Sequence, residues 1–261
     1  MSGHSKWAKI RHKKGANDAK RGALFTKLAK AITIAASEGG GDPDMNFTLR
    51  LAIDKAKKAN MPIDNIDRAV KKGTGEGGEG TIQRIVYEGV GPEGTFFIVS
   101  CSTDNTNRTV AELRKLFEAG GGNLGTSGTA MWQFSEMGVI IVKPERLKKA
   151  EKFGKDDSYE PIDIDELQLE LIDIDGVKDI VKSENEDGED VLEIKTDKND
   201  FAKVHKLVEA VNVAIQSAEL QFVPNDFLKV NSGVEGRVLS LMESIEDHDD
   251  VKNVFTNVDL N

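Results

Sequence analysis

One part of the chain orders its strand and helix patterns in a way that few folds accommodate. Four short apolar runs have the residue types of β-strands, and they lie at residues 138–142, 177–181, 191–195 and 218–222. Apolar residues repeat at helical spacing in two segments, 164–171 between the first two runs and 201–211 between the last two. The order strand, helix, strand, strand, helix, strand predicts a ferredoxin-like sandwich. We therefore expect residues 137–224 to form one domain.

Residues on both sides of this unit carry a second, incomplete set of strands and helices. Before it, strands are expected at residues 82–89, 95–101 and 131–134, with a helix from about residue 106 between the last two. After it come only a helical pattern at 238–245 and a strand pattern at 251–255, too little to bury a core alone. The economical interpretation is one α/β domain made of residues 79–136 and 225–261, with the ferredoxin-like unit inserted into it.

The first 78 residues predict a separate domain of helices. Apolar residues repeat at helical spacing over residues 24–35 and 47–59, and Pro62 opens a third helix because proline suits a first helical turn. The segment GTGEGGEG, residues 73–80, has the composition of a flexible hinge. The expected fold is therefore α+β with three domains: a helical domain with a basic arm at residues 1–78, and two α/β sandwiches, one inserted in the other.

Charge is distributed unevenly along the chain. The formal net charge is −10, yet residues 1–80 contain 16 Lys and Arg against 9 Asp and Glu, a net of +7. The remainder contains 19 against 36, a net of −17. An acidic protein that gathers its cations at one end is suited to a polyanion, because each cation that meets a phosphate releases condensed counterions. A basic tail that is merely solvated is the alternative.

The basic arm supplies the candidate nucleic-acid-binding residues. They are Lys6, Trp7, Lys9, Arg11, His12, Lys13, Lys14, Lys20, Arg21 and Lys27. Trp7 amid cations can stack on a base, or it can anchor the arm on the helical domain, and the sequence does not separate the two. Lys20, Arg21 and Lys27 approach or enter the first helix, where a solvated helix face is the plain alternative.

A second candidate contact is the TDNTNR segment, residues 103–108, between a predicted strand and a predicted helix. A phosphate contact there would use Asn105, Thr106, Asn107 and Arg108 together with outward-facing backbone N–H groups. Capping of the helix is the preferred interpretation. The LGTSGT loop at residues 124–129 could also approach a nucleic-acid backbone closely, or its glycines serve tight turns.

Other classes of function find little support. Gly73, Gly75 and Gly78 match G-x-G-x-x-G, but they follow a helix and precede a strand, the reverse of a dinucleotide site. Cys101, the only cysteine, lies in an apolar strand pattern and is expected in the core of a protein from a reducing cytosol. We expect no metal, cofactor, small-molecule substrate or catalytic group, and no apolar run approaches the length of a membrane span. The prediction is a cytoplasmic protein that is not an enzyme.

Five motifs follow one another within the first 135 residues. They are GHSKWAKIRHKKGANDAKRG, NMPIDNIDRAVKKGTGE, YEGVGPEG, TDNTNRT and GGNLGTSGTAMWQF. Together they resemble the signatures of the YebC/TACO1 family, and the rest of the chain resembles it by layout. The resemblance implies a helical first domain followed by two α/β domains. It also implies nucleic-acid binding, since members are described either as transcriptional regulators that bind DNA or as translational activators that act on the ribosome.

These observations predict a nucleic-acid-binding regulator of gene expression. Ribosomal RNA and the ribosome are the favoured partners, because the strongest feature is a basic arm with one aromatic side chain and not an evident recognition helix. A DNA-binding transcriptional regulator is the alternative.

Overall fold

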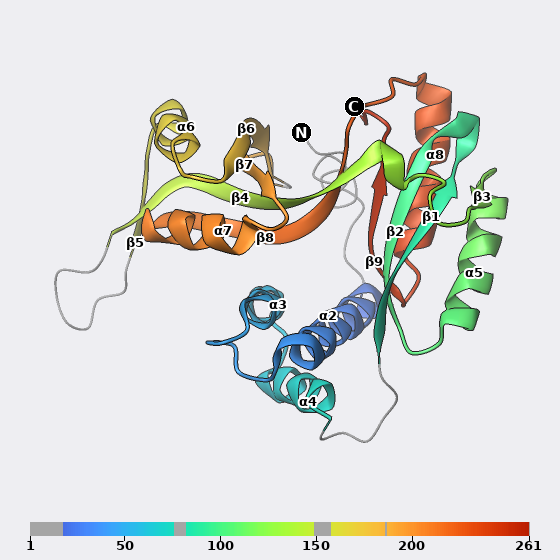
Figure 1. The fold of residues 1–261 in the computed structure, drawn as a ribbon, viewed down its shortest axis with the longest axis horizontal. Helices are drawn as coiled ribbons and strands as arrows, with labels where there is room; N and C mark the ends of the chain where they lie inside the picture. The colour runs from blue at the N-terminus through green and yellow to red at the C-terminus, as the bar shows by residue number, and fades with distance from the viewer. Residues whose placement is uncertain (1–17, 76–81, 149–157, 186, 261) are drawn as a thin grey trace. The chain divides into compact units, whose positions relative to one another are not determined.

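The computed structural model describes residues 18–75, 82–148, 158–185 and 187–260 (Figure 1). Within these ranges the chain forms seven α-helices and two β-sheets, so the fold is the expected α+β mixture, with N-terminal helices followed by α/β domains. Residue contacts divide the described chain into two compact units: Glu136–Val223, and residues 18–135 together with 224–260. No helix in the described ranges combines the length and the apolar character that a membrane crossing requires.

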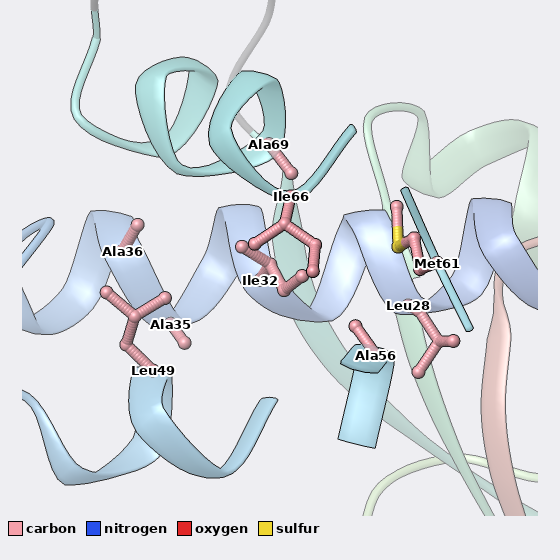
Figure 2. Close-up of a cluster of buried hydrophobic side chains, with 9 residues drawn as sticks. All are labelled: Leu28, Ile32, Ala35, Ala36, Leu49, Ala56, Met61, Ile66 and Ala69. Carbon is pink, nitrogen blue, oxygen red and sulfur yellow. The ribbon is translucent and has the colours of Figure 1, made fainter. Parts of the chain in front are cut away.

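The N-terminal helices pack around a small apolar core. They are α2 (Asp18–Gly39), α3 (Phe47–Lys58) and α4 (Ile63–Gly73). Figure 2 shows nine buried side chains that meet between them: Leu28, Ile32, Ala35, Ala36, Leu49, Ala56, Met61, Ile66 and Ala69. These are the three helices that the apolar spacing predicts, except that Pro62 precedes α4 as its capping residue and is not its first helical residue. The hinge expected at residues 73–80 lies mostly outside the described residues.

Asn46 connects the end of α2 to the start of α3. Its Oδ1 accepts a hydrogen bond from the N–H of Leu49 (3.0 Å), which caps α3. Its Nδ2 donates to the carbonyls of Ala35 (2.7 Å) and Gly40 (2.8 Å). One buried amide therefore satisfies backbone groups at two helix ends and holds the turn between them.

A four-stranded sheet belongs to the same unit as these helices. Its strands are, in order, β3 (Asn123–Leu124), β1 (Gln83–Val90), β2 (Phe96–Thr103) and β9 (Val251–Thr256). β2 pairs antiparallel with both β1 and β9, so the last strand of the chain joins the hairpin as the sequence predicts. Helices α5 (Thr106–Ala119) and α8 (Ser232–Glu246) cover one face of the sheet (Figure 1). Phe117 of α5 meets Phe97 of β2 edge to face, with ring centroids 5.7 Å apart.

The strand predicted at residues 131–134 is wrong. Met131–Gln133 forms a short 3-10 helix, η2, and the fourth strand of the sheet is β3. The physical reason is that the N–H groups of Ala130 and Met131 donate to the buried carboxylate of Glu88, each at 2.7 Å. These donors are therefore not available to a strand ladder.

The unit Glu136–Val223 is built on the second sheet. Its elements are β4 (Phe134–Lys148), β5 (Ser158–Pro161), α6 (Ile164–Ile172), β6 (Val177–Glu184), β7 (Asp190–Asp197), α7 (Phe201–Ala210) and β8 (Val213–Pro224). β4, β7 and β6 are adjacent and antiparallel, and β8 pairs with β4. The succession β4-α6-β6-β7-α7-β8 is the expected ferredoxin-like order, with β5 as an additional strand at the end of β4. That residues 137–224 and the other two segments are separate folding domains stays a prediction.

Candidate nucleic-acid interface

Most of the predicted nucleic-acid-binding residues lie at the N-terminal end of the chain. Those outside the described residues are Lys6, Trp7, Lys9, Arg11, His12, Lys13 and Lys14. Lys20 and Arg21 lie in the first turn of α2, where the structure describes the backbone and not these side chains. Contact of all these residues with a nucleic acid stays a prediction.

Further cations lie in the last turns of α3 and α4. The last turn of α3 holds Lys55, Lys57 and Lys58, and that of α4 holds Lys71 and Lys72. A helix C-terminus carries partial negative charge, so a lysine there stabilises its helix by about 0.3–1 kcal/mol. These lysines therefore have a local structural role, and they also add positive charge to the helical part of the chain.

Lys27 is engaged within the protein. Its Nζ donates to the carbonyl of Glu246 in the last turn of α8. About one turn further along α2, Lys30 donates to the carbonyl of Asp249 (3.1 Å) and to the carboxylate of Asp250 (2.6 Å). Lys27 thus meets the negative C-terminal end of α8, and Lys30 meets the turn that follows this helix. A phosphate contact by Lys27 would first require its bond to α8 to break.

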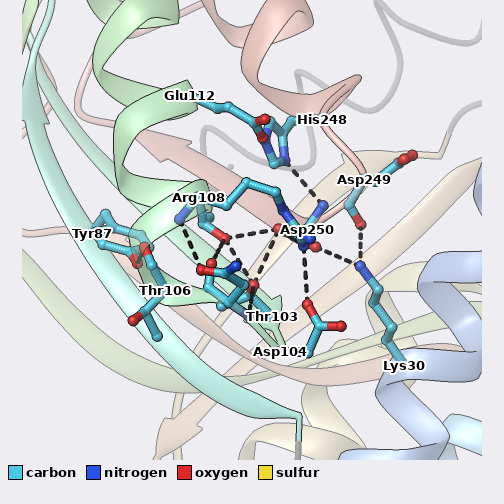
Figure 3. Close-up of polar contacts among 12 residues, drawn as sticks. Lys30, Tyr87, Thr103, Asp104, Thr106, Arg108, Glu112, His248, Asp249 and Asp250 are labelled. Carbon is cyan, nitrogen blue, oxygen red and sulfur yellow. Dashed lines mark hydrogen bonds and ion pairs between the residues drawn. The ribbon is translucent and has the colours of Figure 1, made fainter. Parts of the chain in front are cut away.

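Asp250 lies at the centre of a polar cluster that the sequence analysis did not single out (Figure 3). Its side chain is 2% exposed and accepts hydrogen bonds from Lys30 Nζ (2.6 Å), Thr103 Oγ1 (3.1 Å), Arg108 Nη2 (2.9 Å) and Thr109 Oγ1 (2.8 Å). We call these five residues the Asp250 cluster. Burial raises the pKa of the Asp250 carboxyl, but the bonds from Lys30, Arg108 and Thr109 outweigh burial and hold the pKa well below its usual range. The group is therefore ionised at neutral pH.

The Asp250 cluster joins elements that are far apart in the sequence. Helix α2 contributes the lysine, the end of β2 and the first turn of α5 contribute the hydroxyls and the guanidinium, and the carboxylate immediately precedes β9. Removing the Asp250 carboxylate would destabilise the protein, because its cationic and hydroxyl partners would be left without an acceptor. The cluster therefore holds α2 against the four-stranded sheet.

The TDNTNR segment forms a helix cap. Asn105 Oδ1 accepts a hydrogen bond from the N–H of Arg108 (3.1 Å), in agreement with the capping interpretation. The guanidinium of Arg108 donates to Asp104 (3.0 Å) and Asp250 (2.9 Å). A phosphate contact by Asn105, Thr106, Asn107 or Arg108 stays a prediction, and at Arg108 the phosphate would compete with two carboxylates.

The buried carboxylate of Glu88 binds the backbone at the end of the LGTSGT loop and just after it. Glu88 of β1 is 6% exposed and accepts hydrogen bonds from the N–H groups of Gly128 (2.8 Å), Ala130 (2.7 Å) and Met131 (2.7 Å). Burial raises the pKa of Glu88, but the three N–H bonds outweigh burial and lower it. These backbone donors, which could have met a phosphate, are bonded within the protein.

Cys101 and His248 are two further side chains of chemically reactive types in this unit. Cys101 is fully buried, and burial, together with the charge of Asp250, raises the pKa of its thiol to about 12. The thiol therefore stays protonated at neutral pH, as expected for a core residue. The ring nitrogens of His248 lie 2.7 Å from a carboxylate oxygen of Glu112 and 3.0 Å from the N–H of Asp250. Across the described part of the chain, no group of His, Cys, Asp and Glu side chains is placed to hold a metal ion.

Sequence reasoning missed Lys30, Glu88 and Asp250, which organise this region. Asp250 ends an acidic run that has the composition of a solvated turn, and nothing in the run marks it as buried. Glu88 carried a usable signal, because strand alternation places it on the face of β1 that also presents Val86 and Val90. A carboxylate on an apolar face indicates a buried partner.

Two family profiles match nearly the whole chain. The profile described as the TACO1/YebC protein N-terminal domain matches residues 5–76, and the one described as the TACO1/YebC second and third domain matches residues 82–258. The chain belongs to the TACO1/YebC family. The resemblance carried by the motifs is confirmed, and the basic arm from Lys6 onward is part of the matched N-terminal domain, not an unrelated tail.

TACO1/YebC relatives resemble the chain over its full length. A "probable transcriptional regulatory protein" of Halothermothrix orenii is 45% identical over 261 residues, covering 100% of this chain and 96% of that protein. A protein of Geobacter sulfurreducens, also named a probable transcriptional regulatory protein, is 44% identical and covers 100% of this chain and 96% of its own length. The crystal structure of a conserved hypothetical protein from Aquifex aeolicus matches with a TM-score of 0.82 at 35% identity, over 98% of each chain.

Proposed function

We propose that this TACO1/YebC protein is a nucleic-acid-binding regulator of gene expression that acts on RNA at the ribosome, as a cytoplasmic translation factor. It binds ribosomal RNA through the basic arm and the first turn of α2, and it needs neither a membrane nor a small-molecule substrate. The observation that carries the proposal is the separation of charge, +7 in residues 1–80 against −17 in the remainder. Lys27 would join this interface only after leaving Glu246.

Ion pairs in the unit Glu136–Val223 support the arm as the contact. Seven exposed or half-buried pairs engage cations of this unit: Lys143–Glu189, Arg146–Glu170, Lys148–Glu160, Lys178–Asp197, Lys182–Asp165, Lys198–Glu136 and Lys203–Asp175. Such pairs add little to stability, but each cation in them already has a carboxylate beside it. A phosphate backbone that approached this unit would therefore meet a negative surface.

RNA is favoured over DNA by the kind of element that carries the cations. A helix-turn-helix presents the N-terminal residues of one helix to base edges in the major groove. Here the cations of α3 and α4 lie in the last turns of these helices, and the first turn of α4 contains Asp64. Those in the first turn of α2 directly follow a basic arm with one aromatic side chain. The names of the relatives favour the second candidate, a DNA-binding transcriptional regulator.

Charge reversal at two matched sites tests the proposal. Lys13→Glu with Lys14→Glu changes the arm, and Arg114→Glu with Lys115→Glu makes the same change in net charge at two adjacent exposed cations of α5. We expect the arm variant to lose cosedimentation with ribosomes and affinity for single-stranded RNA, and the α5 variant to keep both. If the arm makes about six phosphate contacts, the slope of log affinity against log salt is about −4 for single-stranded RNA.

The outcomes separate the two candidate functions. Equal losses in both variants would show that only net charge matters and would refute a specific arm. An arm variant that still sediments with ribosomes but loses duplex DNA binding would replace the translation factor with the transcriptional regulator.

A further inference from the structure

Trp132 is an exposed aromatic side chain on a backbone that is held on both sides. The residue is 62% exposed. Just before it, the N–H of Ala130 donates to Glu88 (2.7 Å). At its other side, Asn225 donates through Nδ2 to the carbonyl of Trp132 (3.1 Å) and through its N–H to the carbonyl of Gln133 (2.8 Å). A ring on so firmly held a backbone loses little conformational freedom when a ligand binds to it.

The indole ring itself is also oriented. Its Nε1 donates to the carbonyl of Thr129 (3.2 Å), and the ring packs edge to face against Phe96 with centroids 5.4 Å apart and planes at 72°. Because the N–H is already bonded, the ring offers a π face and no free donor. Such a surface does not read a base edge, but it suits stacking on any unpaired base.

The sequence around Trp132 is free of charge. No Lys, Arg, Asp or Glu occurs between Glu118 and Glu136, in a chain whose net charge is −10. The carboxylate of Glu88, which contacts this segment, is buried and accepts hydrogen bonds from three of its N–H groups. Thr126 and Ser127 are exposed, and their hydroxyls can bond a sugar or a phosphate. A nucleic-acid strand that approaches residues 119–135 therefore meets no charged side chain of that segment, and the exposed Asp226 beside Asn225 is a nearby carboxylate.

A protein partner is the other explanation for an exposed tryptophan. Phe227 and Leu228 are 40% and 39% exposed, and their segment is connected to Trp132 through Asn225. Protein interfaces, however, bury a broad apolar core. The loop next to Trp132 presents glycines and hydroxyls over residues 125–128. One ring among small polar groups suits one base better than the core of a protein interface.

We propose that Trp132 is a stacking platform for an unpaired base of single-stranded RNA, a second contact in addition to the basic arm. This inference rests on the proposed function. It places an RNA-binding residue in the unit that contains the four-stranded sheet. Stacking of one base on an aromatic side chain strengthens binding by about 5- to 100-fold.

Tryptophan fluorescence tests the proposal directly. The chain has two tryptophans, so Trp7→Phe leaves Trp132 as the only indole and retains an aromatic ring at position 7. The probes are poly(U), a poly(A)·poly(U) duplex and heparin, with binding followed separately by sedimentation. We expect poly(U) to quench the indole fluorescence as it binds. Heparin lacks bases and the duplex has no unpaired ones, so both should bind with much less quenching.

Affinity measurements on substituted proteins give a second test. Trp132→Ala should weaken poly(U) binding by about fivefold or more, and Trp132→Phe should retain most of the affinity. Tyr159→Ala, at a 53% exposed aromatic of the other compact unit, is the matched control and should change nothing. Thermal unfolding of each variant confirms that it is folded.

The possible results separate this inference from the proposed function. Binding of poly(U) without quenching, or an undiminished affinity in Trp132→Ala, would overturn the stacking platform and leave the proposed function intact. Loss of ribosome cosedimentation in Trp132→Ala with unchanged poly(U) affinity would show a protein contact and overturn it as well. Absence of poly(U) binding by the parent protein would refute both.

Discussion

Replacing Asp250 with asparagine tests whether the Asp250 cluster holds α2 against the four-stranded sheet. Asparagine keeps the size of the side chain, but it removes the charge and turns one acceptor into a donor. The native carboxylate accepts bonds from two cations, Lys30 and Arg108, and from two hydroxyls, those of Thr103 and Thr109. The substitution therefore weakens each of these four bonds to Asp250 without opening a cavity.

The magnitude follows from the exposure of the two cations. Removing one partner of a fully buried ion pair costs about 3–5 kcal/mol, because the remaining charge is left unpaired. The side chains of Lys30 and Arg108 are 21% and 45% exposed, so water can partly replace the carboxylate. The cost of the substitution is then closer to that of losing hydrogen bonds to a charged group than to that of breaking a fully buried ion pair. We expect the free energy of unfolding to fall by about 2–3 kcal/mol.

Urea unfolding measures this loss. Asp249→Asn is the control, since Asp249 is the exposed neighbour, and its effect should stay within about 0.5 kcal/mol. A double-mutant cycle with Lys30→Met should give a coupling energy of about 1 kcal/mol or more. A loss of less than about 0.5 kcal/mol in Asp250→Asn, or strict additivity with Lys30→Met, would refute the role of the cluster.

The same carboxylate predicts how stability depends on pH. The pKa of Asp250 is lower in the folded protein than its ordinary value of 3.8, so the unfolded chain takes up the proton first as pH falls. Its contribution is therefore complete at neutral pH and is lost from about pH 5 downward, through the lowered folded pKa. Asp250→Asn should remove this part of the acid sensitivity. Parallel pH profiles of the variant and the wild type would contradict the assignment.

Three further predictions concern single contacts elsewhere. Asn46→Ala should lower the free energy of unfolding in urea by about 1–2 kcal/mol, because a helix cap and two carbonyl partners are lost. Gly89→Ala should cost about 1–3 kcal/mol in thermal unfolding, since a Cβ there would lie 2.4 Å from Cε1 of Phe117; an unchanged midpoint would contradict this packing. Cys101 should react slowly with Ellman's reagent in the native protein and rapidly in urea, whereas fast native reaction would disprove its burial.

Most of the fold could be predicted from the sequence because most elements carry their own periodicity. The helices α2 to α8 bury apolar residues at helical spacing, and the long strands contain apolar runs of sufficient length. The exceptions lack such a signal. β5 has four residues, all exposed, and β3 is only two residues long, with Asn123 exposed. The apolar residues at 131–134 suggested a strand, but the carboxylate of Glu88, more than 40 positions earlier in the sequence, accepts hydrogen bonds from the N–H groups of Ala130 and Met131.

The candidate site was predictable only where charge accumulates along the sequence. The basic arm stands out because its cations are neighbours in the chain. The Asp250 cluster does not, because Lys30 and Asp250 are separated by 220 positions and are neighbours only in the folded protein, where β9 pairs with β2. In the sequence, Lys30 belongs to a basic helix, Thr103, Arg108 and Thr109 to a capping segment, and Asp250 to an acidic turn. Only the folded chain makes them one group.

Helix α2 carries both the predicted nucleic-acid interface and the lysines that anchor it. Lys20 and Arg21 lie in its first turn, and Lys30 lies about 15 Å further along the helix axis. Because Lys27 and Lys30 are bonded to the end of α8 and to Asp250, the direction of α2 is fixed relative to the four-stranded sheet. A polyanion held at the first turn would therefore act on an anchored helix. Trp132 lies in η2 and packs against Phe96 of β2 in the same sheet, so the Asp250 cluster fixes the position of α2 relative to the proposed stacking platform.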